Sequence, residues 1–140
     1  GQDLGLRPAM RFETRLVSTR EVSAGDSVGY NSAWTADEST RIGIAAVGYG
    51  DGYLRSFESG TPVIVGQQRA CLVGRVSMDM IAINLGPESP AGVGDGVMLW
   101  GPELPVEEVA PRAGTIPYEL LCNVSARVVA DYLPAPPLMA

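Results

Sequence analysis

The sequence contains neither lysine nor histidine, and all ten of its basic residues are arginine. Without histidine, the chain lacks the usual general base and the commonest metal ligand, so Ser-His-Asp and Cys-His constellations are excluded. Without lysine, it offers no side-chain amine. Chemistry that needs a Schiff base on such an amine therefore cannot take place within this chain.

Charge of either sign is sparse. Charged residues make up 19% of the chain, the net charge is −6, and like charges form no run. Nucleic-acid binding requires a basic face, so an acidic chain with scattered arginines is a poor candidate for it. No apolar run approaches the roughly 18 residues that span a bilayer. No secretory signal precedes the domain, so nothing suggests secretion. From the charge and the short apolar runs, we expect neither a nucleic-acid nor a membrane partner.

Cysteine is also rare, with only Cys71 and Cys122, which lie far apart in the sequence. A disulfide between them stays open as an alternative. Two buried free thiols are the favoured interpretation.

What the sequence does contain is enough apolar material, 46% of 140 residues, for one domain with a real core. Short apolar or alternating runs predict strands, and glycine-rich turns separate them. The predicted strands span residues 10–17, 42–47, 62–65, 70–76, 80–85 and 97–100. This pattern predicts a mainly β fold, an antiparallel barrel or sandwich.

One or two short helices are expected late in the chain. The first spans 105–110, with Pro111 and Gly114 ending it. The second is capped by Thr115 and carries Pro117 in its first turn. Residues 127–132 are predicted to form a last strand.

We expect three segments along the chain. Residues 1–8 are interpreted as a linker from a missing N-terminal barrel, and residues 9–133 as the β domain. Residues 134–140, which hold three prolines, are interpreted as a flexible tail.

Few residues stand out as candidates for chemistry on composition alone. Asp51, Asp79 and Asp95 could ligate a metal, but each lies beside a glycine or a strand end, so a role in turns is favoured. The glycine-rich residues 48–52 match neither a phosphate-binding loop nor a dinucleotide fingerprint. A set of aromatic and arginine residues near turns remains. For any one of them, a structural role in the core is favoured. They are Tyr30, Trp34, Tyr49, Tyr53, Arg55, Arg75 and Tyr118.

The strings around that set resemble those of the alanine racemase family, in order, from about residue 7 to residue 132. They are RPAM at 7–10, SVGY at 27–30, WTA at 34–36, VGYGDGY at 47–53, VGRVSMD at 73–79, GD at 94–95 and GTIPYE at 114–119, with Arg55 between the fourth and fifth. The resemblance identifies the chain as a C-terminal β domain of that family.

The resemblance implies a bacterial, cytoplasmic, homodimeric enzyme. Such enzymes use pyridoxal 5'-phosphate to interconvert L- and D-alanine for peptidoglycan of the cell wall. An N-terminal barrel domain carries the cofactor lysine, and the β domain of one subunit closes the site on the barrel of the other. The chain would then supply half a site, and we expect it to be inactive alone.

The resemblance also implies roles for single residues. Tyr30 corresponds to the tyrosine base, Met78 to the residue whose backbone N–H meets the substrate carboxylate, and Tyr118 to the tyrosine that bonds the cofactor phosphate. The other matched residues line or support the corridor by which the substrate enters. They are Tyr49, Arg55, Arg75, Asp79 and Ile116. We expect Gly48, Gly50 and Gly52 to let the backbone turn sharply near it.

Some positions depart from the family pattern. Asn31 stands where glycine is usual, Ser77 where cysteine is common, and Met80 where glutamine is usual. Because asparagine tolerates a left-handed backbone, the turn at Asn31 can survive. Two alternatives stay open: a racemase for another small amino acid such as serine, and a free-standing β-barrel binding module. The reading frame upstream of Gly1 would separate the second from the leading interpretation.

Overall fold

The computed structural model describes residues 4–134, with Tyr30 described by its backbone alone. Its main feature is a closed antiparallel barrel with the strand order β1-β4-β7-β6-β5-β8, and a separate hairpin pairs β2 with β3. Along the chain the elements are β1 (Phe12–Val22), β2 (Ser27–Val28), η2 (Tyr30–Ser32), β3 (Trp34–Thr35), β4 (Thr40–Ala45), η3 (Tyr49–Asp51), β5 (Pro62–Val65), β6 (Gln68–Val73), β7 (Ile81–Asn84), β8 (Gly96–Trp100), α1 (Val106–Val109), η4 (Ala110–Ala113) and α2 (Pro117–Asn123).

The long strand β1 closes the barrel. Its first residues, from Phe12 to Arg15, pair with β8, and its later residues, from Leu16 to Val22, pair with β4. The register shifts between Leu16 and Ser18, as it does where a strand bends from one neighbour to the next. Closure leaves these short strands without the exposed edges at which other chains could pair.

Apolar side chains fill the barrel and extend under the helices. Trp100 is 1% exposed, and its ring centroid lies 4.6 Å from that of Phe12. Val109 of α1 and Leu120 of α2 are fully buried in the same cluster. The helices are therefore fixed to one end of the barrel by the core itself.

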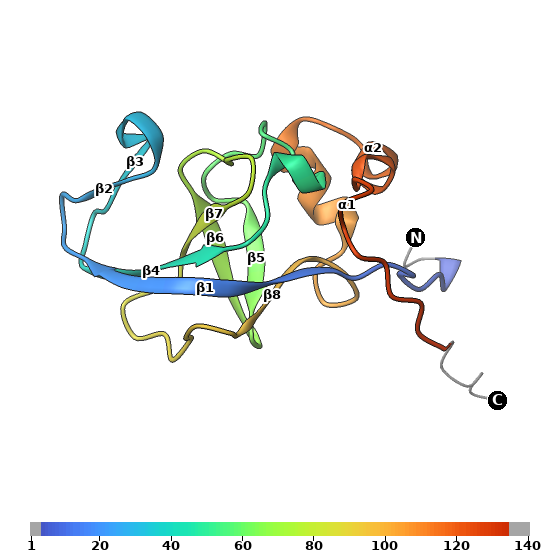
Figure 1. Cartoon of the computed structure of the whole chain (residues 1–140), viewed down its shortest axis with the longest axis horizontal. Coiled ribbons are helices and arrows are strands. Elements are labelled where there is room, and N and C mark those ends of the chain that lie inside the picture. Colours follow the sequence, from blue (N-terminus) through green and yellow to red (C-terminus); the bar gives the residue numbers. More distant parts are fainter. Residues whose placement is uncertain (1–3, 135–140) are drawn as a thin grey trace.

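A second, smaller cluster fixes the β2–β3 hairpin. Val28 from β2 packs with Val22, Ile42 and Val73 of the barrel strands and with Ala36 just after β3. The hairpin carries η2 at its tip. Figure 1 shows this hairpin at one end of the molecule and α1 and α2 at the other. The hairpin and the two helices are therefore well separated.

The predicted fold class, a mainly β antiparallel barrel with one or two short helices, is confirmed. The strand predicted at 62–65 is β5, with the same bounds. The strand predicted at 10–17 runs on to Val22, where its pairing with β4 ends. The β2–β3 hairpin was not predicted, because two-residue strands are too short to show a periodic pattern.

Two local predictions are wrong. Residues 127–132 form no strand, because Ser125 and Arg127 bond to η3 instead of to a strand partner. Thr115 does not cap the second helix, since Ile116 holds the N-cap position without a side-chain bond. The prediction that Pro111 and Gly114 end the first helix is right, because α1 ends at Val109 and Gly114 is the C-cap of the 3-10 turn η4 that follows it.

Both cysteines are free, but the prediction that both are buried fails, because Cys122 is exposed and Cys71 is half-buried. Residues 1–3 of the predicted linker and 135–140 of the predicted tail lie outside the described residues. Among the described residues, no helix is long and apolar enough to cross a bilayer.

Candidate functional site

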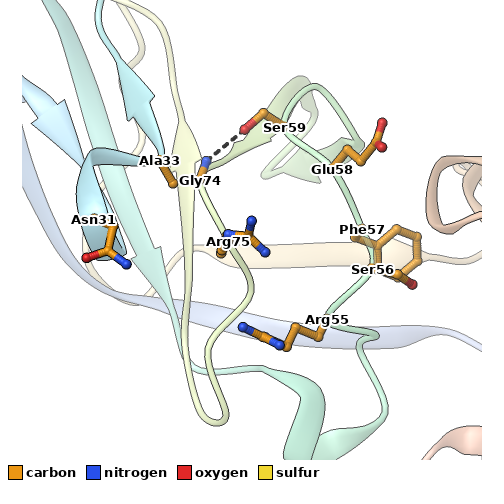
Figure 2. Close-up of a pocket in the computed structure, with 9 residues that line it drawn as sticks. All are labelled: Asn31, Ala33, Arg55, Ser56, Phe57, Glu58, Ser59, Gly74 and Arg75. Carbon is orange, nitrogen blue, oxygen red and sulfur yellow. Dashed lines mark hydrogen bonds between the residues drawn. The ribbon is translucent and has the colours of Figure 1, made fainter.

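A cavity of about 510 Å³ lies between η2, the segment before β5 and the segment after β6. Figure 2 shows the guanidinium groups of Arg55 and Arg75 reaching into it from two different segments, with Asn31 of η2 at its edge. Neither arginine forms an ion pair with another described residue. The cavity therefore presents two guanidinium groups next to η2, and the Glu58 side chain lines it as well.

The turn at η2 is held close to the segment that carries Arg75. A Cβ placed on Gly29 would lie 3.7 Å from the Cα of Gly74, so little more than a methyl group would fit between the two backbones. The Gly74 N–H also donates to Ser59 Oγ at 2.9 Å, which fixes Arg75 on its other side (Figure 2). Asn31 has φ 54° and ψ 34°, the left-handed conformation expected for it.

Two loops meet at the next part of the site, η3 with its flanking glycines and the 77–80 loop. The Tyr49 N–H donates to the Ser77 carbonyl at 3.0 Å, and the Gly50 N–H donates to the Met78 carbonyl at 2.9 Å. Tyr49 and Met78 are half exposed, at 42% and 52%. The fold thus brings together two of the predicted site residues that lie far apart in the sequence.

The glycines of the 48–52 segment serve mainly close packing. A Cβ on Gly48 would overlap the Ser77 carbonyl oxygen, and a Cβ on Gly52 would overlap the Asn123 carbonyl oxygen at the end of α2. Only Gly52 has a positive φ, 107°, that favours glycine for a turn. The prediction that all three permit sharp turns is therefore right for Gly52 alone.

The three aspartates serve as acceptors and as partners of arginine. Asp51 Oδ2 accepts the Gly48 N–H at 2.9 Å and closes the 3-10 turn, and Asp95 Oδ2 accepts the Gly92 N–H at 2.9 Å in a turn. Asp79 Oδ1 accepts from Arg127 at 2.7 Å. These contacts agree with the structural role that the sequence favours for these aspartates.

Arg127 is the residue that sequence reasoning missed. Its Nε donates to Asp51 Oδ1 at 2.7 Å, and its Nη2 donates to Asp79 Oδ1 at 2.7 Å and to the Met78 carbonyl at 3.1 Å. The hydrogen bonds to Asp51, and then to Asp79, raise the pKa of Arg127 above its usual value. No local pattern could have pointed to Arg127, because its aspartate partners lie 76 and 48 residues away.

Ile116 and Tyr118 do not join the other predicted site residues in the chain. They lie at the start of α2 and are 60% and 76% exposed. The β2–β3 hairpin, which carries η2 and Tyr30, lies at the opposite end of the molecule (Figure 1). The predicted site residues thus fall into two groups: one around η2 and the 77–80 loop, and one on α2.

A sequence model of the family described as "Alanine racemase, C-terminal domain" matches residues 9–132. The chain belongs to the alanine racemase C-terminal domain family. This confirms the resemblance seen in the sequence strings. The roles of the single residues stay predictions.

Alanine racemases that resemble the chain are considerably longer than it. Alanine racemase from Shewanella amazonensis is 55% identical over 128 residues, which are 91% of this chain and 35% of the relative. The crystal structure of biosynthetic alanine racemase from Pseudomonas aeruginosa matches with a TM-score of 0.88 and 54% identity, over 91% of this chain and 36% of that one. The chain therefore spans about a third of the length of these relatives.

A further structure bears on the cofactor. Alanine racemase from Bartonella henselae, with covalently bound pyridoxal phosphate, matches with a TM-score of 0.78 and 29% identity, over 84% of this chain and 33% of that one. The cofactor belongs to that larger protein. In this chain, the absence of lysine excludes the amine to which pyridoxal phosphate attaches covalently.

Proposed function

We propose that the chain is the C-terminal domain of a pyridoxal-phosphate-dependent alanine racemase. The enzyme would interconvert L- and D-alanine in the bacterial cytoplasm and supply D-alanine for the cell wall. The observation that carries this proposal is the family match over residues 9–132, together with the arginine-lined cavity beside η2. The domain would contribute one of the two bases that racemisation requires.

Tyr30 is the proposed base. Racemisation removes a proton from one face of the α-carbon and returns one to the other, so two bases must flank that carbon. A phenol with a pKa near 10 is a poor base at neutral pH and needs nearby positive charge or hydrogen bonds. Arg55 and Arg75 carry such charge beside η2, where Tyr30 is placed.

Met78 is the proposed contact for the substrate carboxylate. Within the described part of the chain, the side chain of Tyr30 excepted, the Met78 N–H donates to no acceptor. Met78 as a whole residue is 52% exposed, so the proposed contact lies at the surface of the domain. A free backbone N–H explains how a residue with an apolar side chain can take on a polar task.

The corridor residues select by charge and size. Arg55 and Arg75 would draw a small carboxylate toward the site, because an arginine guanidinium binds carboxylates strongly. Tyr49 lies on η3 beside the 77–80 loop, and Ile116 and Asp79 would complete the corridor or support it. A passage lined by these residues would favour a small amino acid such as alanine over bulky ones.

The residues of this chain fit one contact to the cofactor. Pyridoxal phosphate, when bound, stabilises the negative charge that forms on the α-carbon as its proton leaves. Tyr118 is 76% exposed, and its hydroxyl would donate to a phosphate group. The covalent attachment does not fit, since the chain has no lysine, and it is assigned to an N-terminal barrel domain.

The separation of the two groups of residues supports a homodimer. The hairpin that carries Tyr30 and the helix that carries Tyr118 lie at opposite ends of the molecule (Figure 1). One active site that contains both tyrosines therefore draws them from two copies of the domain. Each chain would close the site on its partner's barrel with Tyr30 and contribute Tyr118 to the site on its own barrel.

The test compares the chain alone with the chain joined to a barrel domain. The purified 140-residue chain, with pyridoxal phosphate and L-alanine, should form no D-alanine. A fusion to the N-terminal part of the Pseudomonas aeruginosa racemase should form it. Substantial turnover by the chain alone would contradict the proposal, as would a folded, cofactor-loaded fusion that binds alanine without racemising it.

A further inference from the structure

Arg127 joins two loops of the site with a single guanidinium group. Its Nε bonds to Asp51 of η3, and its Nη2 bonds to Asp79 and to the Met78 carbonyl of the 77–80 loop. The segment before it adds two further bonds to the same turn: Ser125 Oγ donates to the Gly50 carbonyl at 2.8 Å, and the Ser125 N–H donates to the Asp51 carbonyl at 2.9 Å. The chain after α2 thus holds η3 and the 77–80 loop together.

The backbone leaves room for this guanidinium at one position. A Cβ on Gly50 would lie 2.5 Å from Arg127 Nη2 and 2.7 Å from Arg127 Cζ. Any larger residue would push the arginine away from the turn. Gly50 has no positive φ that would otherwise call for glycine. The close approach of Arg127 is therefore the structural reason for glycine at this position.

The contacts of the 77–80 loop fix the direction of one N–H group. In a trans peptide, the C=O and N–H point in opposite directions. The Ser77 carbonyl accepts from the Tyr49 N–H, so the Met78 N–H of the same peptide is directed away from η3. The next carbonyl, that of Met78, is held by both Gly50 and Arg127. Two successive peptide planes are thereby locked.

We propose that Arg127 is a positioning residue that orients the Met78 N–H toward the substrate carboxylate by locking the 77–80 loop onto η3. This inference rests on the proposed function, because it assigns a purpose to the direction of that N–H. Arg127 itself touches no substrate. Its loss loosens the loop, and the donor is then oriented correctly for only part of the time.

A matched control is available in Arg69. Arg69 binds Glu108 through two hydrogen bonds, of 2.6 and 3.0 Å. Its side chain is 55% exposed, against 45% for Arg127, so the two arginines form comparable surface pairs. Among the described residues, however, the Arg69 side chain forms no hydrogen bond or ion pair with η3 or the 77–80 loop. Replacing it tests the loss of an arginine–carboxylate pair without touching the site.

The first measurement uses the 140-residue chain and needs no activity. Arg127→Gln should speed amide hydrogen exchange of Gly50 and Tyr49, the donors to the 77–80 loop, by about tenfold, because a charge-assisted bond is lost. Arg69→Gln should leave both amides unchanged. Equal exchange in Arg127→Gln and the unmodified chain would overturn the proposed lock.

The second measurement uses the fusion with a barrel domain. Arg127→Gln should raise KM for alanine about tenfold and change kcat much less, since the Met78 N–H binds the carboxylate in ground and transition state alike. Millimolar guanidinium should restore KM partly in Arg127→Ala and not change it in Arg69→Ala. Faster exchange with an unchanged KM would overturn the positioning role. If the unmodified fusion is inactive, the proposed function fails, and the exchange result still decides on the lock.

Discussion

Single residues determine how closely the loops of the site can approach one another. Gly48 lies directly against the 77–80 loop, where a Cβ would meet the Met78 carbonyl carbon at 2.5 Å. Tyr53, five residues on, is fully buried and stacks on Phe57 with ring centroids 4.4 Å apart. Gly48 permits the close approach because it has no side chain. Tyr53 carries a polar hydroxyl group into the core.

Gly48→Ala should lower the free energy of unfolding by about 2 kcal/mol, because the added methyl group forces two backbone segments apart. Gly92→Ala is the matched control. A Cβ on Gly92 meets nothing within 4 Å, so its effect should stay within about 0.5 kcal/mol. Urea unfolding of both variants measures the difference, and equal stabilities would contradict the close packing of Gly48 against the 77–80 loop.

Tyr53→Phe should raise the free energy of unfolding by about 1 kcal/mol. The Tyr53 hydroxyl is buried and has no hydrogen-bond partner among the described residues, so folding removes it from water without compensation. Urea unfolding at neutral pH measures the change. A loss of stability in the variant would show that the hydroxyl has a partner.

The same substitution makes a prediction about alkaline pH. Burial raises the pKa of Tyr53 above its usual value of 10.0. The unfolded chain therefore releases this proton first, and the native protein loses stability as the pH rises above about 10. Tyr53→Phe should remove that part of the decline. An identical slope of stability against pH in both proteins would contradict the burial of the phenol.

At the scale of elements, the β2–β3 hairpin presents η2 through a backbone that few residues tolerate. Asn31 and Ser32 both have φ 54°. Val28 anchors the hairpin in the smaller apolar cluster. The anchored hairpin thus sets the left-handed backbone at position 31, and the residue there has to tolerate that conformation.

Asn31→Val should destabilise the domain by about 1–2 kcal/mol, because a β-branched side chain is strained in the left-handed region. Asn31→Gly and Asn31→Asp should be nearly neutral, since both residues tolerate that region. Thermal unfolding of the three variants compares them. Equal stability of the valine and glycine variants would contradict the left-handed conformation at position 31.

Elements differ in how well the sequence predicts them. β5 was predictable because Pro62 and Gly66 bracket a short apolar run, and the start of α2 because Pro117 suits a first helical turn. The apolar residues after Arg127 predicted a strand, yet its guanidinium binds two distant aspartates and holds the segment on η3. Such long-range pairing leaves no periodic pattern in the sequence.

At the scale of the whole molecule, the candidate site residues could be proposed from the sequence strings but not arranged in space. The fold brings Tyr49 and Met78 together and places Arg55 and Arg75 around one cavity. It leaves Ile116 and Tyr118 on α2, at the end opposite to the β2–β3 hairpin (Figure 1). This division follows from the two separate apolar clusters that fix the helices and the hairpin, and local sequence patterns do not show it.

The central claim is that this domain supplies the base for one face of the substrate. The fusion enzyme tests it through exchange of the α-hydrogen of each alanine enantiomer in D₂O, followed by proton NMR. Tyr30→Phe should slow exchange from L-alanine by about 100-fold or more, which is the rate acceleration that a general base usually contributes. Exchange from D-alanine, which uses the other base, should persist with retention of configuration. An unchanged rate for L-alanine, or equal losses for both enantiomers, would contradict the account.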